Sequence, residues 1–493
     1  MAGRTAPERR LPRAAIGASA AAAALGAQWV LHRGYRWSPF APYLLADLVI
    51  RRAPGWFAAW AIDRLGHSDK PVLVWALIGG ALVLGAALSR FKRVPLAAAA
   101  GVLSLAAASA DPRRPPLAGA LVSAGVAVVA AGAVVVLAGS AGSPDTFDTG
   151  RRRLVAGLAL LGVGAWLVPA ALRRTLRHVP AELVRADRPA IVPTYAVFDA
   201  ISGLSPLVTR RAAHYTVDID LEAPTVSSSS WRLAVGGLVA HPIRLSLADL
   251  RAEVTEERLA TLSCVSNPVG GPLVGNARWT GVPLADLLRQ ARPSPRARFV
   301  VAHGADGYWE TYPFDEAASG GPLVAVGMDG LLLPDGHGFP ARLLVPGHYG
   351  MKSVKWLTRL ELVETDPVGY WGQRGWDEPA VTRTESRIDT PTAFAKVRVP
   401  FVVAGVAWAG TRRIAAVEVS SDGGRSWRPA ELEREAGPLS WRRWRLTVDA
   451  PPGVHPVSVR ATDRTGTLQD PQPRPAHPAG ASGYHRITVA VLP

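Results

Sequence analysis

The chain has very little cysteine: Cys264 is the only one in 493 residues. A single cysteine cannot form a disulfide within the chain, and it cannot supply the several thiolates that an iron–sulfur cluster needs. A basic patch is also missing, although the net charge is +16. The arginines are scattered along the chain and many flank apolar segments, so we expect no nucleic-acid partner.

A chain of this length is expected to hold two or three domains. The sequence predicts a multi-domain fold in which transmembrane helices precede an α+β domain and a β-sandwich. The expected boundaries are a transmembrane anchor region at 1–178, a linker rich in proline at 179–209, the α+β domain at 210–375 and the β-sandwich at 385–493.

Long apolar runs without charge are confined to the first part of the chain. Each is close to the roughly 20 residues that cross the hydrocarbon core of a bilayer. They predict a bundle of about five transmembrane helices, at 14–31, 71–89, 94–110, 117–140 and 154–172. Residues 40–62 are apolar but interrupted by charges and by Pro54, which favours interfacial helices.

Basic clusters precede the first run, separate the second from the third, and precede the fifth. With five spans all three clusters lie on the cytoplasmic side, although other arginines would then lie outside. The rest of the chain is therefore expected to be extracytoplasmic. The runs hold no histidine pair for a haem, and no carboxylate or lysine for an ion path, so they are interpreted as an anchor.

Short β-rich and helical runs alternate from about 210 to 370, which predicts a mixed α+β domain. The last part has strand and turn signals only. "IAAVEVSSDGGRSWRPAEL" is typical of two strands around a turn, and further strands follow at regular spacing. This pattern predicts a β-sandwich of immunoglobulin-like size.

The stretch "TLSCVSNPVGGPLVGNARW" (261–279) places Cys264 before a run of Asn, Pro and Gly that cannot form regular structure. Taken alone, a single cysteine fits a buried structural thiol at least as well as a metal ligand.

Four segments in order resemble the sulfite oxidase family of molybdopterin-dependent oxidoreductases: "TLSCVSN", "ARWTGVPLADLL", "DGHGFPARLLVPGHYGMKSVKWLTRLEL" and "VEVSSDGGRSW". The resemblance covers about residues 215–493. It implies molybdenum with one molybdopterin, with Cys264 as the thiolate ligand of the metal, and a soft thiolate suits such a centre. It also implies that the last domain forms a homodimer.

The resemblance further implies that five residues hold the pterin: Asp306, His337, Arg342, Ser353 and Lys355. The alternative for Arg342 and Lys355 is an ordinary solvated charge, but both lie within apolar strands, where unpaired charges are rare. His337 fits a simple turn residue as well.

Tyr308, in "DGYWETYP", matches the active-site tyrosine of the family. Because side chains alternate between the faces of a strand, burial of Tyr308 in the core is the competing interpretation.

The sequence departs from the family where sulfite oxidases carry arginines for their dianionic substrate. Val269 stands at one arginine position, and "HYTVDIDL" contains no arginine at another. Lys352, His348 and Arg278 are the remaining candidates. Because a divalent anion binds poorly without such charges, a neutral sulfoxide is a serious rival to sulfite as the small-molecule substrate.

We therefore expect a membrane-anchored molybdopterin oxidoreductase that transfers oxygen atoms in two-electron steps. The alternative is a membrane-tethered scaffold that keeps the fold without metal. Since no haem domain is present in this sequence, electrons would be exchanged with a separate protein or a quinone. The arginine run 151–153 fits either a twin-arginine export signal for a folded domain or simple positive-inside anchoring.

Overall fold

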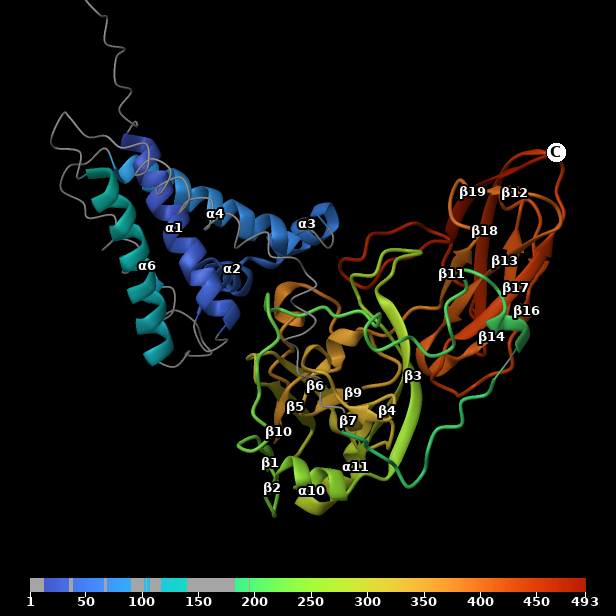
Figure 1. Ribbon diagram of the computed structural model, residues 1–493. Helices are drawn as coiled ribbons and strands as arrows, with labels where there is room; N and C mark the ends of the chain where they lie inside the picture. The colour runs from blue at the N-terminus through green and yellow to red at the C-terminus, as the bar shows by residue number, and fades with distance from the viewer. Residues whose placement is uncertain are drawn as a thin grey trace, which may run out of the picture. The chain divides into compact units, whose positions relative to one another are not determined.

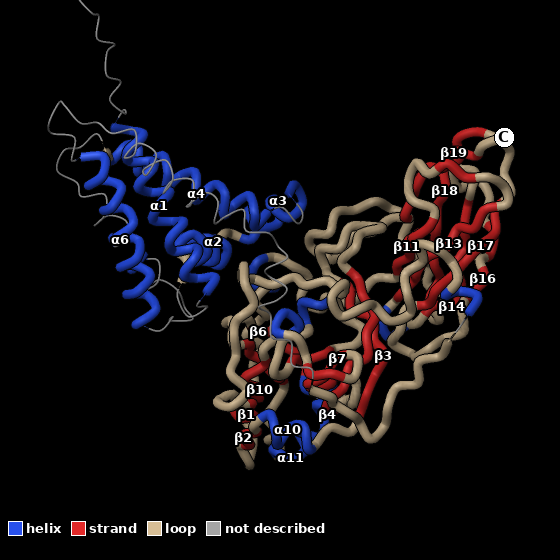
Figure 2. Tube along the Cα trace, in the orientation of Figure 1, coloured by secondary structure: helices blue, strands red, loops and turns tan. Residues whose placement is uncertain are grey.

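The computed structural model describes residues 13–34, 39–65, 69–89, 102, 104–106, 117–139, 182–194 and 196–493. The chain divides into two compact units. One comprises Met1–Ala53, Leu65–His178 and Ile219–Glu222, and the other comprises Pro54–Arg64, Val179–Asp218 and Ala223–Pro493. The described secondary structure before residue 182 is helical, and strands dominate after it (Figures 1 and 2).

The first part of the chain contains five helices among its described residues: α1 (Arg13–Gly34), α2 (Ala41–Arg52), α3 (Gly55–Leu65), α4 (Asp69–Leu88) and α6 (Leu117–Gly139). Small side chains allow close packing. Ala20, Ala23 and Ala24 of α1 contact Ala127 and Ala131 of α6.

The prediction of about five membrane-spanning helices is not confirmed. Among the described residues one helix, Lys70–Leu88 within α4, is long and apolar enough to span a membrane. α1 is rich in alanine, which is only weakly apolar, and its last turn contains His32 and Arg33. The apolar stretch found in α6, Ala120–Ala131, is too short to span a membrane. Most of 94–110 and all of 154–172 lie outside the described residues. The broken apolar segment 40–62 does form two helices, α2 and α3.

Two sheets form the α+β domain. The first has the strand order β2-β1-β10-β5-β6, with the strands Ile243–Leu245, Leu233–Gly237, Leu357–Val363, Phe299–Gly304 and Trp309–Pro313. The second has the order β3-β4-β7-β8, with Glu256–Ser263, Val274–Pro283, Leu323–Met328 and Leu331–Leu332, and β9 (Arg342–Leu344) pairs with β7. Most pairs are antiparallel, but β1 and β10 are parallel.

The helices of this domain follow from local sequence signals. α10 (Leu247–Ala252) begins at a capping box in which Ser246 Oγ accepts from Asp249 N and Asp249 Oδ2 accepts from Ser246 N. α11 (Leu284–Ala291) buries Leu284, Leu287 and Leu288 at helical spacing. β7 is buried along its whole length, as its continuous apolar run LVAVGM predicts.

The last domain consists of two β-sheets with a shared core. Their orders are β11-β13-β17-β16 and β12-β19-β18-β14-β15. The strands in chain order are Glu385–Thr390, Lys396–Val397, Phe401–Trp408, Ile414–Ser420, Arg428–Pro429, Glu431–Leu432, Arg442–Val448, Gly453–Asp463 and His485–Val491. Buried residues of both sheets, among them Val403, Trp444, Val459 and Val489, form one cluster. This arrangement is the β-sandwich that the strand spacing predicts.

Candidate functional site

Cys264 begins the loop that joins the antiparallel strands β3 and β4. Its backbone N donates to Leu273 O at 2.9 Å, which closes the loop directly beyond the last paired residues of the hairpin. The thiol is buried, and its Sγ lies 3.1 Å from Ser266 Oγ. Burial raises the pKa of the Cys264 thiol, while Ser266 and the charge of Lys355 lower it. The thiol therefore needs a cation, such as a metal, to become a thiolate at neutral pH.

Two buried polar atoms beside Cys264 have no hydrogen-bond partner among the described residues. They are Ser263 Oγ and Asn267 Nδ2. Asn267 Oδ1 accepts from Leu273 N at 2.8 Å, so the amide is fixed with its NH₂ group unsatisfied. Because unsatisfied buried donors are costly, these atoms fit a position beside a bound polar group.

Arg342 on β9 is a buried cation held by backbone carbonyls. Its guanidinium donates to His337 O at 3.3 Å and to Ser353 O at 3.0 Å, and it lies 4.9 Å from the ring centre of Trp279. Burial lowers its pKa to about 10, so it stays charged at neutral pH. All its hydrogen bonds in the described structure go to carbonyls, which leaves its charge available for an anion such as a phosphate.

Lys355 and His337 lie against the same backbone. Lys355 Nζ donates to Gly336 O at 3.1 Å and forms an ion pair with Asp218, and burial lowers its pKa. Burial, together with the neighbouring His214 and the Arg342 and Lys355 charges, lowers the pKa of His337 to about 2. His337 is therefore neutral, and its Nε2–H donates to Arg211 O at 3.2 Å.

Ser353 is fixed by the same network. Its Oγ accepts from Val345 N at 3.1 Å, and its carbonyl accepts from Arg342. Asp306 lies at the edge of this group, because its Oδ1 accepts from Tyr308 N at 3.0 Å and its charge raises the pKa of Lys355.

The structure thus brings four predicted pterin residues together directly: His337, Arg342, Ser353 and Lys355. Asp306 adjoins them. Tyr308 is buried, and its hydroxyl donates to Met351 O at 2.8 Å. Cys264 joins the group through the electrostatic effect of Lys355 on its thiol.

The sequence analysis missed His214, Tyr215 and Asp218. All three lie in "HYTVDIDL", the segment noted above only for its lack of arginine. The ring of His214 packs against His337 with centroids 5.3 Å apart, and Asp218 pairs with Lys355. The unusual density of polar groups in that segment was the available signal.

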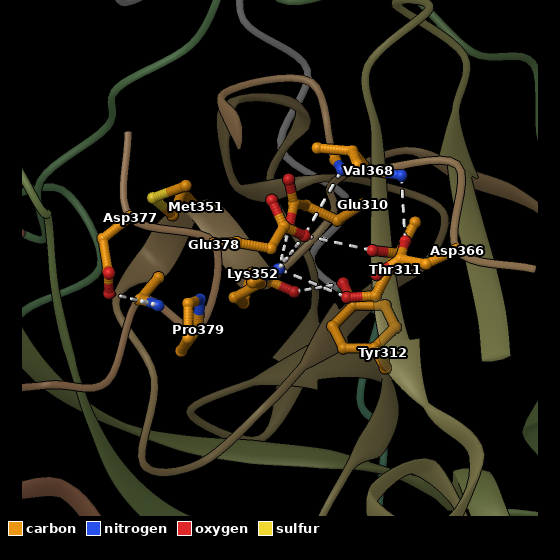
Figure 3. Close-up of polar contacts among 12 residues, drawn as sticks. Glu310, Thr311, Tyr312, Met351, Lys352, Asp366, Val368, Asp377, Glu378 and Pro379 are labelled. Carbon is orange, nitrogen blue, oxygen red and sulfur yellow. Dashed lines mark hydrogen bonds and ion pairs between the residues drawn. The ribbon is translucent and has the colours of Figure 1, made fainter. Parts of the chain in front are cut away.

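The three cationic side chains that could replace the missing arginines are each paired with a carboxylate. Lys352 pairs with Glu310 at 2.5 Å and with Glu378 at 3.2 Å (Figure 3). His348 lies 2.6 Å from Glu316, and Arg278 lies 3.6 Å from Glu257. None of these side chains brings an unopposed positive charge for a dianion.

In the described parts of the chain, no group of three or more His, Cys, Asp or Glu side chains is arranged to hold a metal ion. The residues present do fit a pterin cofactor with a single protein thiolate ligand. Cys264 has unsatisfied polar neighbours, and the charge of the buried Lys355 lowers the pKa of its thiol.

Comparison with known proteins places these features in a family. The family profile "Oxidoreductase molybdopterin binding domain" matches residues 220–371, and "Mo-co oxidoreductase dimerisation domain" matches 380–491. The catalytic subunit MsrP of the protein-methionine-sulfoxide reductase of Ralstonia nicotianae is 32% identical over 242 residues, which cover 45% of this chain and 71% of that one. The chain belongs to the sulfite oxidase family of molybdopterin oxidoreductases.

Two further relatives extend this comparison. The sulfite oxidase of Gallus gallus is 31% identical over 299 residues, which cover 50% of this chain and 65% of the enzyme. The chain thus spans less than two thirds of that relative. The structure of the sulfane dehydrogenase SoxCD from Paracoccus pantotrophus matches with a TM-score of 0.52 at 24% identity, over 65% of this chain and 89% of that one. That match shows the fold: a molybdopterin domain followed by a β-rich dimerisation domain.

Membership of the sulfite oxidase family makes the chain an enzyme with a molybdenum cofactor. When bound, this cofactor supplies two-electron oxygen-atom transfer. The chain's own groups bind and orient it, and shape its surroundings.

Proposed function

We propose that this chain is a membrane-attached molybdenum oxidoreductase that removes an oxygen atom from a neutral sulfoxide. The observation that carries the substrate class is the pairing of Lys352, His348 and Arg278 with carboxylates, together with Val269 at the position of a family arginine. With these three candidate cations paired with carboxylates, the site favours a neutral S-oxide over a dianion.

The reaction balances with two electrons and two protons. The sulfur–oxygen bond breaks, the sulfur is reduced to a thioether, and the oxygen leaves as water. The electrons come from a reduced carrier, either a separate electron-transfer protein or a quinol. Sulfite oxidation is the second candidate, and its support is the 31% identity to the chicken sulfite oxidase.

We further propose the roles of the individual residues. Cys264 binds the metal as a thiolate. Asp306, His337, Arg342, Ser353 and Lys355 hold the pterin, with the buried charges of Arg342 and Lys355 directed to its phosphate. Tyr308 acts beside the reacting atoms. The helix Lys70–Leu88 supports attachment to a membrane, and the match to a dimerisation domain supports a homodimer.

The test uses the full chain, purified from the membrane fraction of a host that makes the cofactor, beside Cys264→Ser. We expect about one molybdenum per chain, because a single thiolate serves one metal centre. We expect reduction of an aryl or alkyl sulfoxide with a reduced viologen dye, and little sulfite oxidation with ferricyanide. Cys264→Ser should lose the activity.

Val269→Arg tests the substrate argument, with Val269→Leu as the size control. Val269 is only half-buried, so an arginine has room there. The arginine variant should gain affinity for sulfite, while the leucine variant should not. Wild-type turnover of sulfite at low concentration, with no sulfoxide reduction, would contradict the substrate assignment. A well-folded chain without molybdenum would leave only the scaffold alternative, and a chain recovered in the soluble fraction would contradict membrane attachment.

A further inference from the structure

Three charged side chains, Glu310, Lys352 and Glu378, form a cluster in which the first two are buried and Glu378 is 32% exposed (Figure 3). Glu310 is on β6, Lys352 ends the short helix η3 (Gly350–Lys352), and Glu378 lies in the segment before β11. The Glu310 carboxylate has no exposed surface, and the Lys352 side chain is 5% exposed. Such burial excludes the solvent that normally screens a surface ion pair.

The cluster is one proton short of neutrality. Two carboxylates and one ammonium carry a net charge of −1 when all are ionised. The Glu310 carboxylate has no exposed surface and shares the Lys352 ammonium with Glu378, so its ionised form is costly, and this cost disappears when Glu310 binds a proton. The composition of the cluster therefore makes it a binding site for a single proton.

Glu310 is the group that takes this proton. Apart from the ion pair with Lys352, its oxygens have no hydrogen-bond donor in the described structure. Glu378 Oε1, by contrast, also accepts from Thr311 Oγ1 at 3.1 Å and from Gly369 N at 3.3 Å, which favours its ionised form. Burial raises the pKa of Glu310 to about 7, although Lys352 opposes the shift.

Other titratable groups surround the cluster and support this assignment. Asp366 raises the pKa of Glu310 further, and the Tyr308 and Tyr312 hydroxyls stay protonated because burial raises their pKa values. The neighbouring Glu316 is engaged by His348. Glu310 is thus the carboxyl of this group that exchanges a proton near neutral pH.

The chain itself and two hydrogen bonds connect the cluster to the segment that holds Ser353 and Lys355. Lys352 directly precedes Ser353 and is three residues from Lys355. The Tyr312 hydroxyl donates to Lys352 O, and the Tyr308 hydroxyl donates to Met351 O. Glu310 and Tyr312 alternate along β6 and so share one face, and Tyr308 directly precedes that strand. A change in the charge of Glu310 therefore acts on the segment that holds the cofactor.

We propose that Glu310, Lys352 and Glu378 form a redox-linked proton site, in which Glu310 binds one proton when the molybdenum centre held by the adjoining segment gains electrons. Added negative charge favours the neutral form of a nearby carboxyl. Glu310 is a positioning and proton-holding residue. It stores one of the two protons that sulfoxide reduction consumes, and the reduced carrier supplies both electrons. The inference rests on the proposed function.

The experiment compares the full chain with Glu310→Gln, in cofactor-loaded and cofactor-free preparations. Glutamine keeps the shape of the side chain and leaves Lys352 in a neutral pair with Glu378. Infrared difference spectra against pH should show a carboxylic acid that titrates near pH 7 in the wild type, in both preparations, and its band should be absent from the variant. The potential of the molybdenum centre, followed by electron paramagnetic resonance, should fall with rising pH across this range in the wild type and fall less steeply in Glu310→Gln.

Glu433→Gln is the matched control, because Glu433 is a buried carboxylate in the last domain that forms two hydrogen bonds with the buried Arg443. It should leave both readouts unchanged. Glu310→Asp retains a carboxyl and should restore a pH-dependent potential, and it replaces the glutamine variant if that variant fails to fold.

Three results would overturn the inference. The carboxyl band could persist in Glu310→Gln, the potential of that variant could change with pH as steeply as that of the wild type, or the wild type could show no titrating carboxylic acid. A chain without molybdenum would overturn the proposed function and the redox linkage together. The infrared titration of the cofactor-free protein would then decide separately whether Glu310 binds the proton.

Discussion

At the scale of single residues, burial and the neighbouring charges together decide whether an ionisable side chain is charged. His337 is neutral because the cations around it add to the effect of burial, whereas the pKa of His348 is raised, because its contact with Glu316 outweighs burial. Glu385, on β11, is buried with the Tyr349 hydroxyl 3.1 Å away as donor. Burial raises the pKa of Glu385 to about 8. The charge state of each group thus follows from its partners.

Glu385 predicts a dependence of stability on pH. Above the unfolded value of 4.5 and up to about 8, the folded chain holds a proton on Glu385 that the unfolded chain has released. The free energy of unfolding should therefore fall as pH rises, by up to about 1.4 kcal/mol per pH unit from this group. Glu310 acts in the same direction, but its effect ends near pH 7.

Denaturant unfolding of the wild type and Glu385→Gln at pH 7 and 8 measures this contribution. The free energy of unfolding of the variant should change less over that interval. Glu364→Gln, at an exposed carboxylate paired with Arg296, is the control and should follow the wild type. Equal slopes for Glu385→Gln and the wild type would show that Glu385 is ionised in the folded chain.

At the scale of elements, two tyrosine hydroxyls bind η3, one from Tyr312 on β6 and one from Tyr308 directly before that strand. The hydroxyl of Tyr308 donates to Met351 O and that of Tyr312 to Lys352 O, and both side chains are buried. The two tyrosines make equivalent structural contacts, but only Tyr308 is assigned to the reaction. They form a matched pair for separating structure from catalysis.

Tyr308→Phe and Tyr312→Phe should each lower the free energy of unfolding by about 1–2 kcal/mol, because each leaves a buried carbonyl without its donor. Only Tyr308→Phe should also lower kcat, on the order of a hundredfold, as expected for loss of a group acting at the reacting atoms. Thermal unfolding and steady-state kinetics with a sulfoxide measure the two effects. Equal losses of kcat in both variants would assign Tyr308 a purely structural role.

The sequence predicted elements more fully than contacts. Short β-rich runs located β5, β7, β10 and the strands of the last domain, and the apolar strand around Arg342 correctly indicated a buried arginine. The pairing of Lys352 with Glu310, 42 positions earlier in the chain, was not visible, because no local pattern records which strand faces which turn. For the same reason Lys352 was counted among the free cations.

At the scale of the whole molecule, the α+β domain and the last domain share one interior. Trp441 Nε1 donates to Leu207 O at 3.0 Å, and Asn276 Nδ2 donates to Ser440 Oγ at 2.9 Å. Trp441 packs in a cluster with Leu259 of β3 and Val406 of β13. We therefore expect the two domains to unfold together.

Trp441→Ala should destabilise both domains by about 3–5 kcal/mol, because it leaves a large cavity at their junction. Calorimetry of the wild type should show one unfolding transition that covers both domains. The midpoint temperature of that transition should be higher in the wild type than in the variant. Trp427→Ala, at a side chain that packs on Tyr484 within the last domain, is the comparison and should cost less. Two well-separated transitions in the wild type would contradict a shared interior.

The loop after Cys264 touches the last domain directly. Arg387 donates to Gly271 O at 3.0 Å, and a Cβ on Gly270 would lie 2.2 Å from the ring of His485. If the last domain were exchanged between relatives, the hybrid could therefore lose the contacts between that domain and the loop after Cys264. A donor domain with a bulkier side chain facing Gly270, or without a counterpart of Arg387, would displace the loop that follows Cys264 while leaving both domains folded. Recombination at this domain boundary should give a folded, active hybrid only when both parents have the same residues at the positions of Gly270, Arg387 and His485.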